Sequence, residues 1–333
     1  MTLPRCAAGS LVLALLGGCA RDAEVRLDRS EDRVVTVQPV GRGEIGFVVA
    51  ARMTDGARHV VVLDAVPPFV KVFDRQGHLR AAFARKGAGP GEVEAPSALA
   101  ASGDTAILVA DARGGLSVFD LDGRLKWRSR PLGIVPLALA PGCGGGWTLY
   151  GPAVTRARSP AWLHDLQPSG DSAVLRGTLQ DSLPAEGVGI GLAYGLVRGP
   201  AGLVLRHDAG HAVYARGCGA LAPSLLFQTP ARGSRGEIRS GEGRQVTHAP
   251  PGTRAVAGIA EVAGGWVLAD VFAGGGTELV LHRRGGATRT RRVRGEWFLR
   301  DSGPGGVLVS TDDPDPRLYV LRPAAFERLF ARR

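Results

Sequence analysis

The sequence has few cysteines, almost no lysine and no long apolar run beyond its first residues. Its 333 residues include four cysteines, and lysine occurs only at positions 71, 86 and 126, so nearly all positive charge is arginine. No segment beyond the N-terminus reaches the roughly 18 apolar residues of a spanning helix. Almost no window shows a sustained helical period, which argues against a helical fold.

Motifs for catalysis are also missing. The chain has no Gly-x-Ser-x-Gly, and Gly87-Ala88-Gly89-Pro90-Gly91 lacks the Gly-Lys-Ser/Thr ending of a phosphate loop. The segment His207-Asp208-Ala209-Gly210-His211 offers two metal ligands, but Asp-Ala-Gly between two apolar stretches is typical of a hairpin turn. We therefore predict no catalytic residue, no metal site and no cofactor, with a bound divalent cation as an alternative.

The N-terminus predicts export. One positive charge at Arg5 precedes a short apolar core that ends in Leu16-Gly17-Gly18-Cys19, which is the arrangement of a secretory signal. These four residues resemble the lipobox of bacterial lipoproteins, and that resemblance implies cleavage before Cys19 and acylation of this cysteine. We thus expect a signal peptide over residues 1–18, a lipidated tether over 19–32, and contact with the membrane through the anchor alone. Ala20 follows Cys19 in place of an Asp that favours inner-membrane retention, which favours the outer membrane or cell surface.

The charge balance bears on partners. Removal of residues 1–18 takes away Arg5, so the net charge falls from +10 to +9. Basic residues are scattered, which together with export disfavours nucleic acid as a partner and leaves anionic lipid or polysaccharide as the alternative.

A repeat of 46 to 47 residues determines the predicted fold. Residues 62–79 and 109–125 both have a strand ending in Asp, a turn, a strand ending in Val-Phe-Asp, and a turn closed by Gly. Weaker copies follow to the end of the chain. About four strands in this length is the spacing of a propeller blade, so we predict an all-β chain with a single β-propeller over 33–333, most simply of six four-stranded blades.

The two ends of the chain predict how the ring closes. Residues 317–322 fit the third strand of the last blade, and a short helix over 323–330 follows. The fourth strand of that blade is predicted from Arg33 to Gln38, so that pairing of the N-terminal and C-terminal strands hides two sheet edges.

Three segments in order, Phe73-Asp74-Arg75-Gln76-Gly77, Gly87-Ala88-Gly89-Pro90-Gly91-Glu92-Val93 and Pro96-Ser97-Ala98-Leu99, carry a family resemblance. They resemble the bacterial six-bladed propellers related to NHL repeats, with Val93 in place of the usual Phe. The resemblance covers residues 60–125. It implies the fold and a secreted setting, and it implies no general activity.

The innermost strands of the blades would line a central channel. The segments that we predict there are apolar, with neither His nor carboxylate: 45–50, 97–101, 135–140, 190–196, 255–260 and 297–300. A glutamate precedes four of them, so Glu44, Glu94, Glu186 and Glu296 are predicted candidates for a ligand-binding ring at one mouth, where carboxylates would suit a divalent cation or a cationic ligand. Solvated turn residues are the alternative interpretation.

Two further features remain open. Cys143 and Cys218 lie in Gly-rich turns of adjacent predicted blades, and an exported protein permits a disulfide between them. An insertion at about 228–253 carries four arginines and two glutamates, and is either a solvated loop or an arm that contacts a partner.

These observations favour a non-catalytic binding scaffold at the cell envelope, which binds protein, peptide or glycan through the propeller faces. The alternative is a metal-dependent hydrolase or lyase of the six-bladed propeller type, with its site at the channel mouth. The apolar inner strands disfavour that alternative, because acid–base and metal sites need convergent polar groups. A third interpretation, a purely structural envelope protein, predicts no selective partner.

Overall fold

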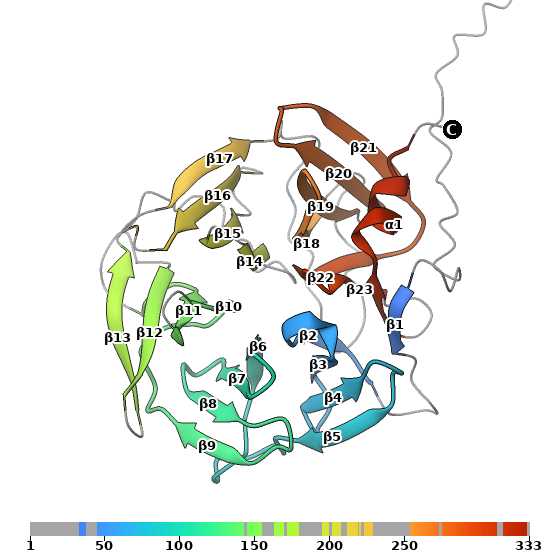
Figure 1. Ribbon diagram of the computed structural model, residues 1–333. Coiled ribbons are helices and arrows are strands. Elements are labelled where there is room, and N and C mark those ends of the chain that lie inside the picture. The colour runs from blue at the N-terminus through green and yellow to red at the C-terminus, as the bar shows by residue number, and fades with distance from the viewer. Residues whose placement is uncertain are drawn as a thin grey trace, which may run out of the picture.

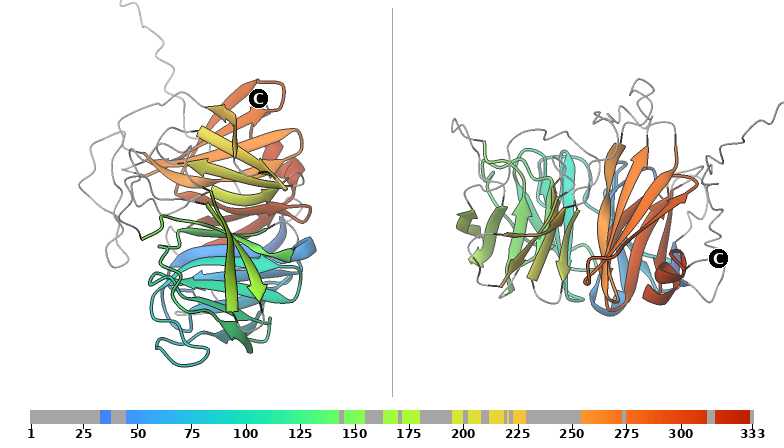
Figure 2. Two further views of the ribbon diagram at one scale, coloured as in Figure 1. Left: turned by 90° about the vertical axis from the view of Figure 1, so that its left-hand side faces the viewer. Right: turned by 90° about the horizontal axis from the view of Figure 1, so that it is seen from above.

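The computed structural model describes residues 33–37, 45–142, 145–154, 163–169, 172–179, 195–199, 202–207, 212–218, 220, 223–228, 254–272, 275–311 and 316–331. These residues form an all-β ring of antiparallel sheets around a centre (Figure 1). Figure 2 shows that the strands run between the two faces of the ring. The predicted β-propeller is therefore confirmed.

Four sheets have four strands each, in sequence order from the centre outwards. Blade 1 consists of β2 (Val48–Met53), β3 (His59–Asp64), β4 (Val70–Asp74) and β5 (Leu79–Phe83). Blade 2 consists of β6 (Pro96–Ser102), β7 (Ala106–Asp111), β8 (Leu116–Phe119) and β9 (Leu125–Arg128). Blade 3 consists of β10 (Ala138–Pro141), β11 (Trp147–Tyr150), β12 (Leu163–Ser169) and β13 (Ser172–Leu179). Blade 4 consists of β14 (Gly195–Gly199), β15 (Gly202–His207), β16 (Ala212–Gly217) and β17 (Ser224–Gln228).

The fifth sheet has eight strands and contains two such groups. Blade 5 consists of β18 (Arg254–Val262), β19 (Gly265–Phe272), β20 (Thr277–Arg283) and β21 (Thr288–Val293). Blade 6 consists of β22 (Trp297–Gly303), β23 (Gly306–Thr311), β24 (Arg317–Leu321) and, as its outer strand, β1 (Arg33–Val37). A parallel bridge between Gly258 and Leu299 joins the two groups. The number of blades in the whole chain stays a prediction, because residues 180–194 and 229–253 lie outside the described part.

Strand β1 closes the ring as predicted. It pairs antiparallel with β24, with Val35 opposite Val320 and Val37 opposite Leu318. The helix α1 (Pro323–Arg328) follows β24 directly, and proline at its first turn fits the missing N–H there. The first and last strands of the described chain thus share one sheet.

The hydrophobic core lies between the blades. Six clusters of buried side chains each join two neighbours; for example, Leu63 of blade 1 packs with Leu99 and Phe119 of blade 2. The cluster of Val60 and Phe73 with Leu308 and Val320 joins blade 1 to blade 6. Because an isolated four-stranded blade leaves an apolar face uncovered, stacking around a ring is what stabilises it.

The repeated aspartates have a structural role. The carboxylate of Asp64 accepts hydrogen bonds from the N–H groups of Gly46, Phe47 and Val66, and from Lys71. Asp111 of blade 2 accepts from the N–H groups of three residues at corresponding places, Glu94, Ala95 and Arg113. Each Asp therefore holds the loop that leads into the inner strand of its own blade.

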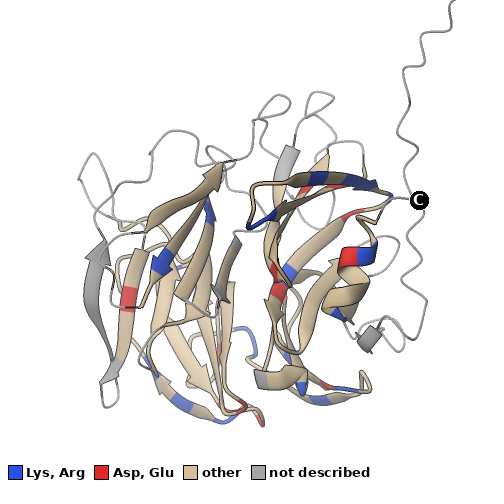
Figure 3. Cartoon of the chain, turned by 45° about the horizontal axis from the view of Figure 1, so that its top comes forward, with Lys and Arg blue, Asp and Glu red and all other residues tan. Residues whose placement is uncertain are grey.

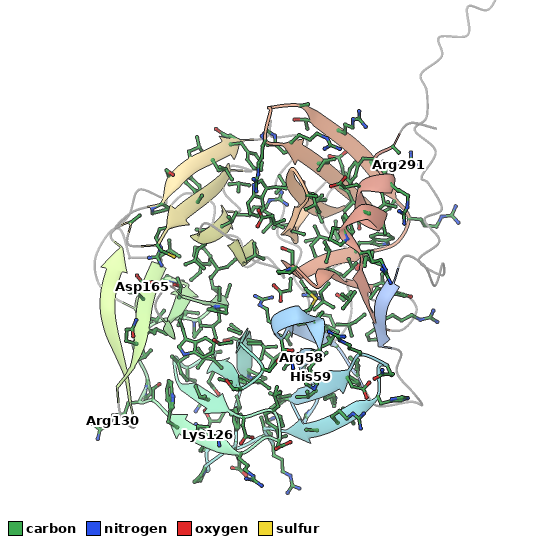
Figure 4. All side chains as sticks on the ribbon, viewed as in Figure 1. Arg58, His59, Lys126, Arg130, Asp165 and Arg291 are labelled. Atoms are coloured by element: carbon green, nitrogen blue, oxygen red, sulfur yellow. The ribbon has the colours of Figure 1, made fainter. Side chains whose placement is uncertain are left out.

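Four buried arginines connect blades, and we call them the bridging arginines: Arg52, Arg206, Arg216 and Arg300. Arg216 on β16 binds both carboxylate oxygens of Asp165 on β12, at 2.5 and 3.0 Å; Figure 4 labels Asp165. Arg300 on β22 donates to the carbonyl oxygens of Val48 and Val49 on β2. Guanidinium groups suit this work, because five donors in a fixed plane can satisfy several backbone acceptors together.

Candidate functional site

A cavity of about 700 Å³ lies at the centre of the ring, at the end of the channel where the inner strands finish. All six inner strands contribute to its lining, and we call it the exit cavity. Its walls are mostly small or apolar residues, among them Ala101 on β6, Ala140 on β10 and Leu196 on β14. The polar groups that line it are Arg52, Thr54, Glu261, Arg284, Asp301 and Ser302.

Arg52, on β2, extends to the inner strands of two other blades. Its guanidinium donates to the carbonyl oxygen of Leu139 on β10 at 3.3 Å and to that of Arg300 on β22. Burial lowers the pKa of this guanidinium, and the negative charge of Asp301 opposes that shift. The arginine thus connects three blades and also lines the cavity.

Asp301 supplies the first carboxylate of the cavity. Its oxygens accept hydrogen bonds from the N–H of Met53 at 2.8 Å and from the N–H of Ser302 at 2.9 Å. Burial raises the pKa of Asp301 above its ordinary value of 3.8, although the charge of Arg52 and these two N–H groups oppose the rise. A hydrogen-bond donor or cation from a ligand would stabilise the ionised carboxylate further.

Glu261 supplies the second carboxylate, at the end of β18. It accepts from Arg284, at 2.9 Å between Oε1 and Nη2, while its backbone N–H donates to the Ser302 hydroxyl on β22 at 2.8 Å. Burial raises the pKa of Glu261, and Arg284 opposes the rise. Arg284 is two-thirds exposed at the neighbouring turn, so it can exchange its partner for a ligand without being drawn out of water.

The site therefore combines two carboxylates and the guanidinium group of Arg52 on strands with the guanidinium group of Arg284 at a turn, within a largely apolar wall. Such a cavity falls within the range of volumes that small ligands occupy in proteins. Carboxylates accept hydrogen bonds from hydroxyl and ammonium groups, and guanidinium groups bind carboxylates and hydroxyl oxygens. The arrangement is suited to a polar ligand that carries hydrogen-bond donors and acceptors close to one another.

The two described glutamates of the predicted acidic ring lie at the opposite end of the inner strands from the exit cavity. Glu94 and Glu296 precede the inner strands β6 and β22, and neither lines the exit cavity. Glu94 forms an ion pair with the exposed Arg113, and Glu296 is partly buried. Glu44 and Glu186 lie outside the described residues, so the ring stays a prediction. Within the described ranges, no group of three or more His, Cys, Asp or Glu could hold a metal ion.

Other predicted residues fall partly outside the described chain. Cys218 takes part in a disulfide bond, whereas Cys6, Cys19 and Cys143 lie outside the described residues, so its pairing with Cys143 stays a prediction. The predicted arm is described only at Gln228 and the anchor not at all. Residues 208–211 connect β15 to β16, which pair as a hairpin with His207 opposite Ala212.

The exit cavity was missed because the inner strands end later than predicted, and at three of them the added residues carry charged side chains. Strand β2 continues to Met53, β18 to Val262 and β22 to Gly303, and these extensions bring in Arg52, Glu261 and Asp301. The prediction of inner strands free of carboxylates was therefore wrong at their ends. The turn signals at Gly264-Gly265 and at Gly303-Pro304-Gly305-Gly306 mark the true ends and could have placed them.

The fold and this site define a β-propeller with a polar cavity at one end of its channel. No protein-family model matches the chain, and no curated protein matches it. A Bacteroides fragilis protein whose name describes it as exported has a similar structure, with a TM-score of 0.62 at 13% identity over 87% of this chain and 94% of its own. A gluconolactonase of Xanthomonas campestris has a TM-score of 0.50 at 14% identity, over 83% and 86%. The β-propeller domain of Swd1 from Myceliophteria thermophila gives 0.49 at 13% identity, over 87% and 98%.

These identities show the fold alone. Among the described residues, no helix is both long and apolar enough to span a membrane.

Proposed function

We propose that the protein is an exported, lipid-anchored binding protein of the cell envelope whose peptide or glycan ligand enters the exit cavity. The anchor rests on Leu16-Gly17-Gly18-Cys19, which resembles a lipobox behind a secretory signal. The structural neighbour whose name describes it as exported supports the proposed export of this chain. One observation carries the binding role: the cavity collects Arg52, Glu261, Arg284 and Asp301 at the meeting point of all six inner strands.

The chemistry of the cavity favours a ligand rich in hydroxyl or ammonium donors. Burial raises the pKa of both carboxyl groups, so each gains from a donor that replaces lost water. The exposed Arg284 can bind a carboxylate or hydroxyl oxygen of the same ligand while its partner Glu261 turns to a donor. A sugar or a peptide terminus presents such groups within the size of the cavity.

The experiment that tests the proposal is a screen of the full chain carrying Cys19→Ala on peptide and glycan arrays. Ala263→Trp provides the cavity test, because Ala263 is exposed in the turn between β18 and β19 and lines the cavity, so a bulky side chain there narrows the cavity without entering the core. The proposal expects selective hits that Ala263→Trp abolishes. Hits that survive this substitution, or none at all, would overturn it.

The anchor is tested separately in growing cells. Incorporation of labelled palmitate into the protein is expected for the natural sequence and is expected to be lost with Cys19→Ala. Unlabelled protein in both strains would contradict the proposed lipidation and leave the cavity result unaffected.

A second candidate, a hydrolase or lyase with its site at the channel mouth, is favoured by the raised pKa of Glu261 and Asp301. A general acid needs a carboxyl group that stays protonated closer to neutral pH. To distinguish catalysis from binding, ligands selected on the arrays are incubated with the protein, with and without a divalent metal, and analysed for reaction products. Products that disappear with Glu261→Gln would favour catalysis, and unchanged ligands would favour binding.

A further inference from the structure

The polar side chains of the exit cavity all come from one half of the ring. Among the described lining residues, blades 5, 6 and 1 contribute every polar side chain: Glu261, Arg284, Asp301, Ser302, Arg52 and Thr54. These three blades are consecutive, because a strand bridge joins blade 5 to blade 6 and a buried cluster joins blade 6 to blade 1. One continuous side of the cavity is therefore polar.

The other half of the ring contributes an apolar lining. Blades 2, 3 and 4 supply six of the described lining residues, and none of them has a polar side chain: Ala101, Gly103, Ala140, Pro141, Leu196 and Val197. In Figure 3 most of the strand surface around the centre is tan, so charged residues are sparse there. A ligand that fills the cavity thus contacts polar groups on one side and small or aliphatic groups on the other.

The polar half is better suited to an ammonium group than to an anion. The two carboxylate oxygens of Asp301 each accept one backbone N–H, from Met53 and from Ser302, and a carboxylate can accept further donors. Arg52, in contrast, directs its guanidinium donors to backbone carbonyl oxygens of blades 1, 3 and 6. The described lining holds no aromatic ring of the kind that binds quaternary ammonium groups, so a primary ammonium group fits better.

The ion pair of Glu261 and Arg284 adds an acceptor and a donor next to Asp301. The N–H of Glu261 donates to the Ser302 hydroxyl at 2.8 Å, so this pair neighbours the strand that carries Asp301. Arg284 is two-thirds exposed, which places it on the solvent side of the pair. An extended peptide presents one N–H and one carbonyl oxygen per residue, and these groups match Glu261 and Arg284, respectively.

We propose that the exit cavity binds the amino terminus of a peptide whose first side chain is aliphatic. The α-ammonium group donates to Asp301, and the first side chain packs against the lining from blades 2, 3 and 4. The peptide backbone then leaves the cavity past Glu261 and Arg284. This proposal rests on the binding role proposed above and narrows its ligand class. Burial of one aliphatic side chain accounts for a gain in affinity of at least about 10-fold.

The test titrates peptide amides into the full chain with Cys19→Ala by isothermal calorimetry. The reference probe is the amide of Leu-Ser-Gly-Ser, in which the α-ammonium group is the only charge. Its N-acetylated form is expected to bind at least about 10-fold more weakly, because it lacks the charged donor. A probe that begins with Ser in place of Leu is expected to lose a similar factor, because it buries no aliphatic side chain.

Two variants assign these contacts to residues. Asp301→Asn is expected to reduce the preference for the free over the acetylated peptide to less than about threefold. Asp122→Asn, the same substitution at an exposed turn outside the cavity, is expected to leave that preference unchanged. Ala101→Leu narrows the apolar half and is expected to shift the preferred first residue from Leu to Ala. Thermal unfolding shows whether each variant is folded, and the probes compared on the reference chain need no variant.

Equal affinity for the free and acetylated peptides, or no binding of either, would overturn the proposal. An unchanged preference for Leu in a folded Ala101→Leu chain would overturn the placement of the first side chain against blades 2, 3 and 4. Glycans selected on the arrays and lost with Ala263→Trp would overturn the peptide ligand and still support the binding role. The two proposals therefore fail separately.

Discussion

Arg206 and Asp270 form a fully buried ion pair across the boundary between blades 4 and 5, with 2.5 Å between Nη2 and Oδ1. Arg206 also donates to the carbonyl oxygen of Ala269 at 2.8 Å, and no part of its side chain is exposed. In the sequence, Asp270 occupies the position that corresponds to Asp64 of blade 1 and Asp111 of blade 2. Those two aspartates bind loops within their own blades, whereas Asp270 binds Arg206 of the neighbouring blade.

Breaking this pair should destabilise the protein strongly. Arg206→Leu leaves Asp270 as a buried charge without its partner, and we expect a loss of about 3–5 kcal/mol in the free energy of unfolding. The double variant Arg206→Leu with Asp270→Leu should recover much of that loss. Urea unfolding measures both, and Arg113→Leu, which removes an exposed pair with Glu94, should cost less than about 1 kcal/mol. Equal costs for the buried and exposed pairs would contradict this account.

The cavity carboxyls predict a particular pH dependence of stability. Because burial raises the pKa of Asp301, the folded state binds more protons than the unfolded state, so the free energy of unfolding falls as pH rises above the ordinary 3.8. Asp301→Asn should flatten this fall between about pH 4 and the folded pKa. Unfolding followed by circular dichroism at a series of pH values measures the slope.

Asp74 provides a control of opposite sign. Burial would raise its pKa, but the N–H groups of His78 and Gln76, together with the charge of Arg80, outweigh burial and lower it. Its contribution to stability is therefore present above 3.8 and is lost as pH falls below that value. Asp74→Asn should alter the pH dependence of the free energy of unfolding only at acid pH. A change in that dependence at higher pH would contradict a lowered pKa for Asp74.

The turn glycine of the repeat is needed for two separable reasons. Gly123 has φ of +84°, and an added Cβ would lie 2.5 Å from the Phe83 ring of blade 1. Gly133 has φ of +67° with open space around it. Gly133→Ala should cost about 1–2 kcal/mol from backbone strain alone, and Gly123→Ala about 1–3 kcal/mol more. Thermal unfolding of both variants checks this, and a smaller cost at Gly123 would show that Phe83 moves aside freely.

Ring closure by β1 makes a further prediction. Deleting residues 20–37 removes the outer strand of blade 6 and exposes an edge of β24, so unfolding should begin at a clearly lower denaturant concentration. Deleting residues 20–32 keeps β1 and should leave the midpoint unchanged. Equal midpoints for the two deletions would mean that β1 contributes nothing to closure.

The repeated turns could be predicted from the sequence, whereas contacts between residues far apart in the chain could not. Asp74 and Asp120 recur with the same turn, and each accepts two backbone N–H bonds in the same pattern, so local chemistry made this unit visible. Arg52 looked like any other arginine in an arginine-rich chain. Its contacts with Leu139 and Arg300 join residues 87 and 248 positions away, and no local pattern encodes them.

The exit cavity was hidden for a related reason. Glu261 and Asp301 lie at strand ends, and a shift of one to three residues in a predicted boundary decides whether a side chain counts as strand or turn. Of the four predicted glutamates, Glu94 and Glu296 are described, and both lie before an inner strand, at the other end of that strand from the cavity.

The most direct test of the account compares charge removal at the two ends of the channel. A ligand selected on the arrays is titrated by isothermal calorimetry into the Cys19→Ala chain and into two double variants of it. Glu261→Gln with Asp301→Asn alters the exit cavity, and Glu94→Gln with Glu296→Gln alters the two described glutamates of the predicted acidic ring, before the inner strands β6 and β22. We predict a loss of at least about 10-fold in affinity for the first pair, since buried hydrogen bonds to charged groups contribute about 1.5–3 kcal/mol each, and no change for the second. A loss of affinity confined to the Glu94 and Glu296 pair would contradict binding in the exit cavity and favour the predicted acidic ring.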